Sequence, residues 1–241
     1  MPEPLLHLEG VHTHIGQYHI LQGVDLTVPA GGLTMLLGRN GAGKTTTLRS
    51  IMGLWQPSQG KVVFDGAEIS GMATADIARQ GIAYVPENMG LFSNLTVQEN
   101  MVLAARKGPM DEARLDWIFR LFPALRKFWR LPAGNLSGGQ KQMLAIARAI
   151  AEPRRLLLVD EPTKGLAPSI VEALIEAFLD LKRSKTTILL VEQNFHMACA
   201  VGDSVAVMDD GHVVHGGAMA ELAEDEALQQ RLLGLSLDTE S

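Results

Sequence analysis

Cysteine is almost absent from this 241-residue chain, which contains only Cys199. A single cysteine excludes an internal disulfide and fits the reducing conditions of the cytoplasm. Basic residues are outnumbered by acidic ones, 21 to 27, and the net charge of −6 argues against a nucleic-acid-binding surface. No apolar run approaches the ~18 residues of a membrane span, and residues 1–4 lack the features of a signal peptide. We therefore expect a cytoplasmic protein that has no membrane span of its own and binds no nucleic acid.

A glycine-rich segment fits the phosphate-binding P-loop pattern. In that pattern a glycine, four free positions, a glycine, a lysine and a hydroxyl residue follow a strand and open a helix. The apolar run 33–37 predicts the strand and residues 46–52 predict the helix. Backbone N–H groups of such a loop bind the β- and γ-phosphates of a nucleotide, and we expect Lys44 to bridge these phosphates and Thr45 to ligate Mg²⁺. The predicted nucleotide-binding residues of this segment are Gly38, Arg39, Asn40, Gly41, Ala42, Gly43, Lys44, Thr45 and Thr46.

Two adjacent carboxylates follow another apolar run. Residues 156–159 predict a buried parallel strand, and Asp160 and Glu161 come directly after it, where the carboxyl end of such a strand opens into a crevice. We expect Asp160 to hold the Mg²⁺ shell and Glu161 to accept a proton from the attacking water. Taken alone, this segment could also be an acidic loop, but the P-loop in the same chain favours the catalytic interpretation.

A second serine- and glycine-rich segment leads into a helix. Its residues are Ser137, Gly138, Gly139 and Gln140, and residues 141–150 predict the helix. A helix N-terminus is an anion-binding site, so the chain has two of them. One phosphate loop is typical of an NTPase, and the second indicates a nucleotide that is enclosed from two sides.

These three motifs, in this order and across the whole chain, resemble the ATP-binding subunit of an ABC transporter. The resemblance implies that the Ser137–Gln140 loop of one subunit completes the ATP site that Lys44, Asp160 and Glu161 form in its partner. It implies an Mg²⁺-dependent ATPase that dimerises head to tail, with itself or with a related ATPase, around two ATP molecules. It also implies two transmembrane permease subunits, an indirect link to a periplasmic solute-binding protein, and a peripheral position on the inner face of the membrane.

Three departures from the usual ABC pattern narrow the resemblance. Glu87 stands where a glutamine usually ends the strand before the helical subdomain, Ala167 replaces an aspartate, and Gln193 replaces the switch histidine. These replacements are similar to those of the smaller, LivF-type ATPase of importers for branched-chain or hydrophobic amino acids. Gln193 can donate a hydrogen bond near the γ-phosphate without carrying charge, and we expect it to assist catalysis. We expect Glu87 to bind Mg²⁺ or its waters and not to act as the base.

The sequence does not decide which residue contacts adenine. The family stacks the purine on an aromatic residue in the loop after the first strand. The matching position here is Ile15, and Tyr18 lies three residues later. Aliphatic packing by Ile15 and stacking by Tyr18 both fit, and Tyr18 could equally be an ordinary turn residue.

The whole chain is expected to form a single ABC-type P-loop NTPase domain of the α/β class. Alternating apolar positions in residues 1–32 predict an N-terminal antiparallel β subdomain. Apolar residues at three- and four-residue steps predict an inserted helical subdomain over about residues 88–152. The RecA-like core and the β subdomain then take about residues 1–87 and 153–241. The pattern from 219 to 235 predicts one amphipathic helix.

The resemblance also implies a groove between the helical subdomain and the core that accepts a short permease helix. We expect the segment from Glu87 to Asn100, with Leu91, Phe92 and Leu95, to form one wall. Alternative functions are the ATPase of an amide or urea importer, a lipopolysaccharide-type exporter, and a non-transport ABC ATPase acting on ribosomes or DNA. A catalytically inactive module is a further alternative, against which the intact P-loop lysine and acidic pair argue.

Overall fold

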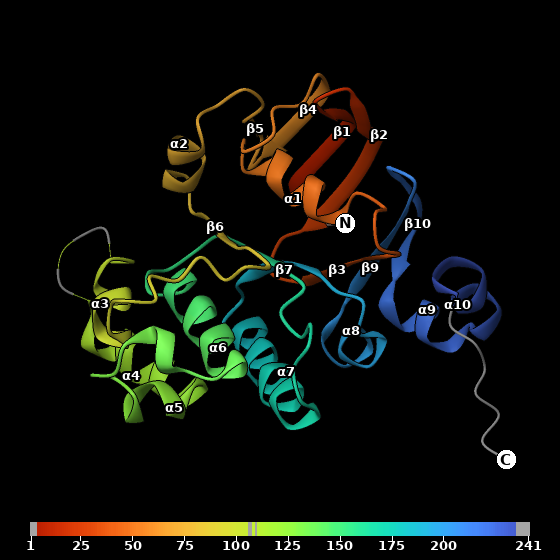
Figure 1. The fold of residues 1–241 in the computed structure, drawn as a ribbon. Helices are drawn as coiled ribbons and strands as arrows, with labels where there is room; N and C mark the ends of the chain where they lie inside the picture. The colour runs from red at the N-terminus through yellow and green to blue at the C-terminus, as the bar shows by residue number, and fades with distance from the viewer. Residues whose placement is uncertain (1–3, 106–107, 109, 235–241) are drawn as a thin grey trace, which may run out of the picture.

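The computed structural model describes residues 4–105, 108 and 110–234, and it contains two β-sheets (Figure 1). The smaller sheet is antiparallel, with strand order β2-β1-β4-β5. Its strands are β1 (Pro4–Ile15), β2 (Tyr18–Pro29), β4 (Gln59–Phe64) and β5 (Ala67–Glu68). The predicted N-terminal antiparallel sheet is therefore confirmed.

The larger sheet has six strands in the order β10-β9-β3-β8-β7-β6. All neighbours pair in parallel except β10, which runs antiparallel to β9. Its strands are β3 (Leu33–Gly38), β6 (Ile82–Val85), β7 (Leu156–Asp160), β8 (Thr187–Val191), β9 (Ser204–Asp209) and β10 (His212–Ala218). The carboxyl ends of β3, β7 and β8 therefore meet at one edge, and this edge carries the P-loop and the acidic pair.

Helices cover both faces of the larger sheet (Figure 1). One side holds α1 (Lys44–Ile51), between the two sheets, and the outlying α2 (Thr74–Arg79). The other side holds α7 (Pro168–Arg183) and α8 (Phe195–Val201). Between β6 and β7 the chain forms α3 (Val97–Val102), α4 (Glu112–Leu121), α5 (Pro123–Lys127), a 3₁₀ turn (Ala133–Asn135) and α6 (Gly138–Ala149).

The central strands are buried on both faces, as the continuous apolar runs predict for a parallel sheet. Successive side chains of a strand point to opposite faces, so each strand contributes to two apolar clusters. Leu158 and Leu189 pack with α1 and the antiparallel sheet, whereas Leu157 and Leu190 pack with α6 and α7. Each fully buried aliphatic side chain contributes about 1.5–3 kcal/mol. This two-sided core fixes the positions of the strand ends.

The predicted single helix over 219–235 is wrong. The chain forms α9 (Met219–Glu224) and α10 (Glu226–Leu233), which are separated at Asp225. The Asp225 backbone leaves the helical region, and its Oδ1 accepts a hydrogen bond from the Leu228 N–H at 2.9 Å. Asp225 therefore caps a second helix instead of continuing the first. Leu235, at the end of the predicted helix, lies outside the described residues.

Candidate functional site

The loop between β3 and α1 brings its backbone close to neighbouring elements at two glycines. A Cβ on Gly38 would lie 2.2 Å from the Met208 carbonyl oxygen of β9. Gly43, which precedes α1, has φ +105°, and a Cβ there would lie 2.9 Å from Leu21 Cδ2. Only glycine fits both positions without displacing its neighbours. The loop thereby presents backbone N–H groups at the start of α1, which is the geometry of an anion-binding nest.

Lys44, the first residue of α1, has its ammonium group folded into this loop. Its Nζ donates to the carbonyl oxygens of Gly38 at 2.9 Å and Arg39 at 3.1 Å. The same Nζ lies 3.6 Å from Glu161 Oε1, and only 4% of the Lys44 side chain is exposed. A buried cation at the start of a helix, inside a glycine-rich loop, is suited to bind a polyphosphate.

Asp160, the last residue of β7, faces the hydroxyl of Thr45. Thr45 Oγ1 donates to Asp160 Oδ1 at 3.0 Å. Burial raises the pKa of Asp160, the Thr45 hydrogen bond lowers it, and the nearby charges of Glu161 and Glu87 raise it further. An accumulation of carboxylates in a buried place is a favourable environment for a cation.

The donor atoms at this site fit Mg²⁺. A carboxylate and a hydroxyl are the oxygen ligands that this ion prefers, and it commonly takes one or two carboxylates together with substrate phosphates. Among the described residues, no group of three or more His, Cys, Asp or Glu side chains could hold a metal ion by itself. The geometry of Thr45 and Asp160 therefore fits an ion that arrives with a nucleotide.

Tyr84, on β6, is a site residue that the sequence analysis missed. Its hydroxyl donates to Asp160 Oδ2 at 3.3 Å, whereas Thr45 donates to Oδ1 of the same carboxylate. Burial, followed by the charge of Asp160, raises the pKa of Tyr84 to about 12, so the phenol keeps its proton and stays a donor. No local motif marks this tyrosine, because it meets Asp160 only through the pairing of β6 with β7.

Glu161 has a left-handed backbone conformation, with φ +46°. Its N–H donates to the Val191 carbonyl of β8 at 2.9 Å, which fixes the turn after β7. Gln193 Nε2 donates to Glu161 Oε1 and to Asn40 Oδ1, each at 2.7 Å. Gln193 thus connects the acidic pair with the P-loop, where a hydrogen-bond donor to a terminal phosphate would be needed.

Glu192 is a second residue that the sequence analysis missed. It is 2% exposed, and its carboxylate accepts hydrogen bonds from the Thr163 N–H at 2.9 Å and the Thr163 hydroxyl at 2.7 Å. Its other oxygen accepts from the N–H groups of Gln193 and Asn194 at 3.0 and 3.2 Å. A buried carboxylate satisfied by four donors holds the loop after Glu161 against the end of β8.

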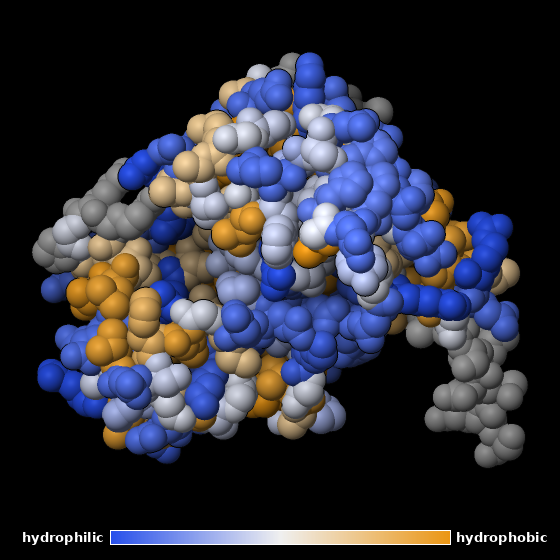
Figure 2. Space-filling view, turned by 45° about the horizontal axis from the view of Figure 1, so that its top comes forward, coloured by the Kyte–Doolittle hydropathy of each residue, from blue (hydrophilic) through white to orange (hydrophobic). Residues whose placement is uncertain are grey.

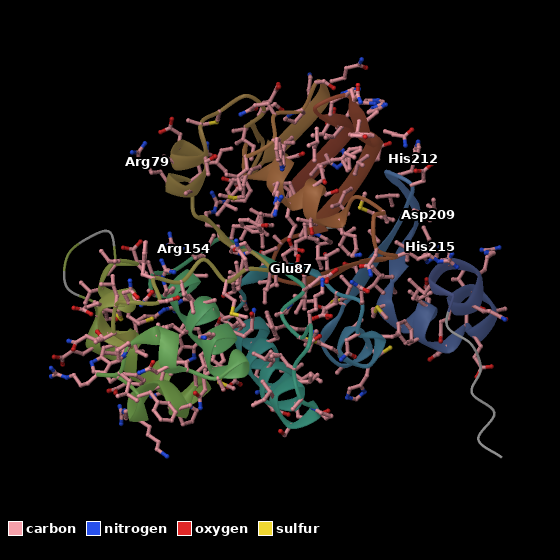
Figure 3. The ribbon with its side chains drawn as sticks, in the orientation of Figure 1. Arg79, Glu87, Arg154, Asp209, His212 and His215 are labelled. Atoms are coloured by element: carbon pink, nitrogen blue, oxygen red, sulfur yellow. The ribbon has the colours of Figure 1, made fainter. Side chains whose placement is uncertain are left out.

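Glu87 lies just after β6, and Figure 3 shows it near the middle of the molecule in the region of β7. Its Oε1 lies 2.6 Å from Lys164 Nζ, and the same Nζ lies 3.5 Å from Glu161 Oε2. The hydrogen bond to Glu87, together with the charges of Glu161 and Glu87, raises the pKa of Lys164. Glu87 therefore forms an ion pair with a lysine, and its contact with Mg²⁺ or its waters stays a prediction.

The remaining predicted residues lie apart from this cluster. Ser137 caps α6. The Ser137 hydroxyl accepts a hydrogen bond from the Gln140 N–H at 3.3 Å, and the Ser137 N–H donates to Gln140 Oε1 at 3.0 Å. Within the described part of the chain, the Ser137–Gln140 loop shares no hydrogen bond or ion pair with the P-loop. Ile15 and Tyr18 face each other at the end of the β1–β2 hairpin, and Tyr18 is 67% exposed.

A cavity of about 810 Å³ opens between the core and the helices that follow β6. Its lining includes Pro86 and residues 88–90, but not Leu91, Phe92 or Leu95. Of the predicted wall, residues 88–90 line the cavity, whereas the Phe92 ring packs against the guanidinium of Arg148, 5.2 Å from the ring centre. Figure 2 shows hydrophobic side chains gathered on these helices, beside a hollow below the antiparallel sheet.

The ABC transporter family model matches residues 21–164, which include the P-loop, the Ser137–Gln140 loop and the acidic pair. The chain belongs to the ABC transporter family. This ABC ATPase is 36% identical, over 95% of its length and 100% of the relative, to the high-affinity branched-chain amino acid transport ATP-binding protein BraG of Pseudomonas aeruginosa. It is 38% identical to the probable branched-chain amino acid transport ATP-binding protein LivF of Archaeoglobus fulgidus, over 91% and 94% of the two chains.

The fold of the ABC ATPase is similar to that of a solved ATP-binding cassette, a dimeric post-hydrolysis state bound to ADP and phosphate. The TM-score is 0.79 at 25% identity, over 89% of this chain and 98% of that one. The predicted family, nucleotide-binding fold and ATPase class are thereby confirmed. Within the described ranges, no helix has the length and apolar character needed to cross a membrane.

Proposed function

We propose that this ABC ATPase powers the import of branched-chain or related hydrophobic amino acids across the cell membrane. The observation that carries the proposal is the match to two branched-chain amino acid transport ATP-binding proteins over at least 91% of this chain and 94% of theirs. Glu87 and Gln193, two of the three replacements on which the sequence resemblance to that branch rests, both lie beside the acidic pair. The subunit would sit on the inner face of the membrane through its permease partners.

Each side chain has a defined task in the proposed hydrolysis. Lys44 and the loop N–H groups bind the phosphates, and Thr45 and Asp160 hold the metal. Bound Mg²⁺ would supply positive charge at the phosphates. Glu161 accepts the proton of the attacking water, while Gln193 orients Glu161 and donates toward the γ-phosphate.

We propose that two subunits close around two nucleotides. The support is the position of the Ser137–Gln140 loop, which caps α6 and is not bonded to the P-loop of its own chain in the described residues. Residues 88–152, which contain the helices from α3 to α6, would form the lobe that carries this loop. The second subunit could be an identical chain or a related ATPase. The solved ATP-binding cassette of similar fold is dimeric, which supports a dimer of such subunits.

We also propose that the cavity beside β6 accepts a permease helix. Two exposed leucines line it, Leu54 after α1 and Leu103 at the end of α3. Three arginines line the cavity, Arg49, Arg148 and Arg154, of which Arg154 pairs with Glu152 at 3.5 Å, and no aspartate or glutamate is among the described lining residues. Figure 3 shows Arg154 on the side toward the helices. An amphipathic helix with an acidic residue fits this chemistry.

Replacement of Leu103 by aspartate is expected to abolish permease binding and transport while the ATPase activity of the isolated subunit stays within about twofold. Leu103 is 57% exposed, so the change places a carboxylate in the cavity without disturbing the core. The matched control is Val214→Asp on β10, which is 51% exposed and does not line the cavity. Co-purification with the permease measures binding. Equal losses in both variants, or none in Leu103→Asp, would contradict the docking site.

The proposed function is tested by purifying tagged Glu161→Gln protein from gently solubilised native membranes in ATP and Mg²⁺. Mass spectrometry should identify two hydrophobic permease subunits and an ATPase subunit in stoichiometric amounts. The same complex purified with the parent ATPase in place of Glu161→Gln, together with its solute-binding protein, should then take up leucine or isoleucine into vesicles in the presence of ATP. Uptake of an amide or urea instead would correct the solute. Recovery of ribosomal or DNA-repair proteins without any permease would overturn the transport function.

A further inference from the structure

Three carboxylates lie at the nucleotide site of this subunit. Asp160 and Glu161 follow β7, and Glu87 is close enough to raise the pKa of Asp160 by its charge. Lys44 is the cationic side chain that lies inside the P-loop. A nucleoside di- or triphosphate would therefore bring its own negative charge next to three carboxylates. A second cation at this place would reduce that repulsion.

Lys164 occupies the place of such a cation. It lies three residues after Glu161, in the turn before α7, and its Nζ is 2.6 Å from Glu87 Oε1 and 3.5 Å from Glu161 Oε2. Glu87 and Lys164 are 77 residues apart in the chain, and the order of β6 and β7 brings them together. One ammonium group thus contacts two of the three carboxylates.

The same lysine completes the support of the Glu161 carboxylate. Gln193 donates to Oε1 of Glu161 at 2.7 Å, and Lys164 lies on the side of Oε2. The turn that carries Lys164 is fixed independently, because Glu192 accepts both donors of Thr163, the residue before it. The lysine therefore stands on an ordered backbone although its side chain is 57% exposed.

We propose that Lys164 is a positioning residue of the nucleotide site, which neutralises Glu87 so that the site can bind a polyphosphate and which holds Glu161 from its second side. This inference rests on the proposed role of the P-loop and the acidic pair. The role of Lys164 requires no direct contact with the nucleotide. It acts through Glu87 and Glu161, and its effect on nucleotide binding depends on the charge at position 87.

The test compares charge variants of Lys164 and Glu87, singly and together, by their affinity for a nucleotide in the absence of metal. Fluorescence titration with mant-ADP in EDTA is expected to show about five- to tenfold weaker binding for Lys164→Met, because the charge of Glu87 is left uncompensated. Lys164→Arg, which keeps the charge, should bind within about twofold of the parent. The double variant Glu87→Gln/Lys164→Met should also return to within about twofold, and all differences should shrink at high salt.

Two controls separate this effect from a general loss of structure. Lys61→Met removes an exposed lysine of β4 and should bind mant-ADP as the parent does. Thermal unfolding of each variant without nucleotide checks the fold. Parental affinity in Lys164→Met, or a double variant as weak as Lys164→Met alone, would overturn the inference and leave the nucleotide site intact. A parent protein that bound no mant-ADP would overturn the site assignment, and the inference with it.

Discussion

Glu161→Gln is expected to lower steady-state ATP turnover by about 10²- to 10⁴-fold, the usual contribution of a general base. The amide keeps the shape of the side chain and can still meet Gln193 Nε2 through its oxygen. It cannot accept a proton from water at neutral pH. ATP binding is therefore expected to remain, and the ATP-bound dimer should accumulate. Phosphate release measures the turnover, and size-exclusion chromatography with ATP and Mg²⁺ measures the dimer.

The matched control is Glu172→Gln on α7. Glu172 is exposed and pairs with His196 at 3.0 Å, away from the P-loop, so its loss should leave turnover within about twofold of the parent. Glu161 has φ +46°, and glutamine bears the same backbone cost as glutamate, so the two variants should unfold at similar temperatures. Parental turnover in Glu161→Gln would show that another group serves as the base.

The parts of the fold that could be predicted from the sequence depend on local signals. The run before Gly38 is strand β3, the run before Asp160 is strand β7, and the alternating N-terminal positions form the antiparallel sheet. Each of these elements is determined by the spacing and burial of apolar residues within one short segment of the chain. The second helix that begins after Asp225 was missed because the apolar pattern continues through the break. The capping aspartate is a stronger signal there than the periodicity.

The contacts around the acidic pair could not be predicted in the same way. Glu87 and Lys164, Tyr84 and Asp160, and Thr163 and Glu192 are 77, 76 and 29 residues apart in the chain. Their meeting depends on the strand order β8-β7-β6, which no single segment encodes. The P-loop could be predicted because Gly38 to Thr45 is continuous in the chain and each residue type has a separate steric or electrostatic reason.

Lys44→Ala is expected to weaken nucleotide binding about 100-fold, because two charge-assisted hydrogen bonds of about 1.5 kcal/mol each would be lost. Hydrolysis should fall at least as far. The measurement is thermal unfolding with and without ATP and Mg²⁺. Ligand that binds only the folded state raises the unfolding temperature in proportion to the logarithm of its concentration over its dissociation constant. The parent should show this rise, and Lys44→Ala should show little of it.

Lys44→Ala is also expected to change the stability of the nucleotide-free protein. Lys44 Nζ satisfies the carbonyl oxygens of Gly38 and Arg39, so its removal should also lower stability without nucleotide by about 1–3 kcal/mol. Lys61→Ala, on the exposed surface of β4, should change neither quantity. A variant that lost stability but still gained the full thermal shift from ATP would show that Lys44 supports the loop and does not bind phosphate. Loss of the thermal shift beyond the loss of stability is therefore the result that assigns the phosphate contact to Lys44.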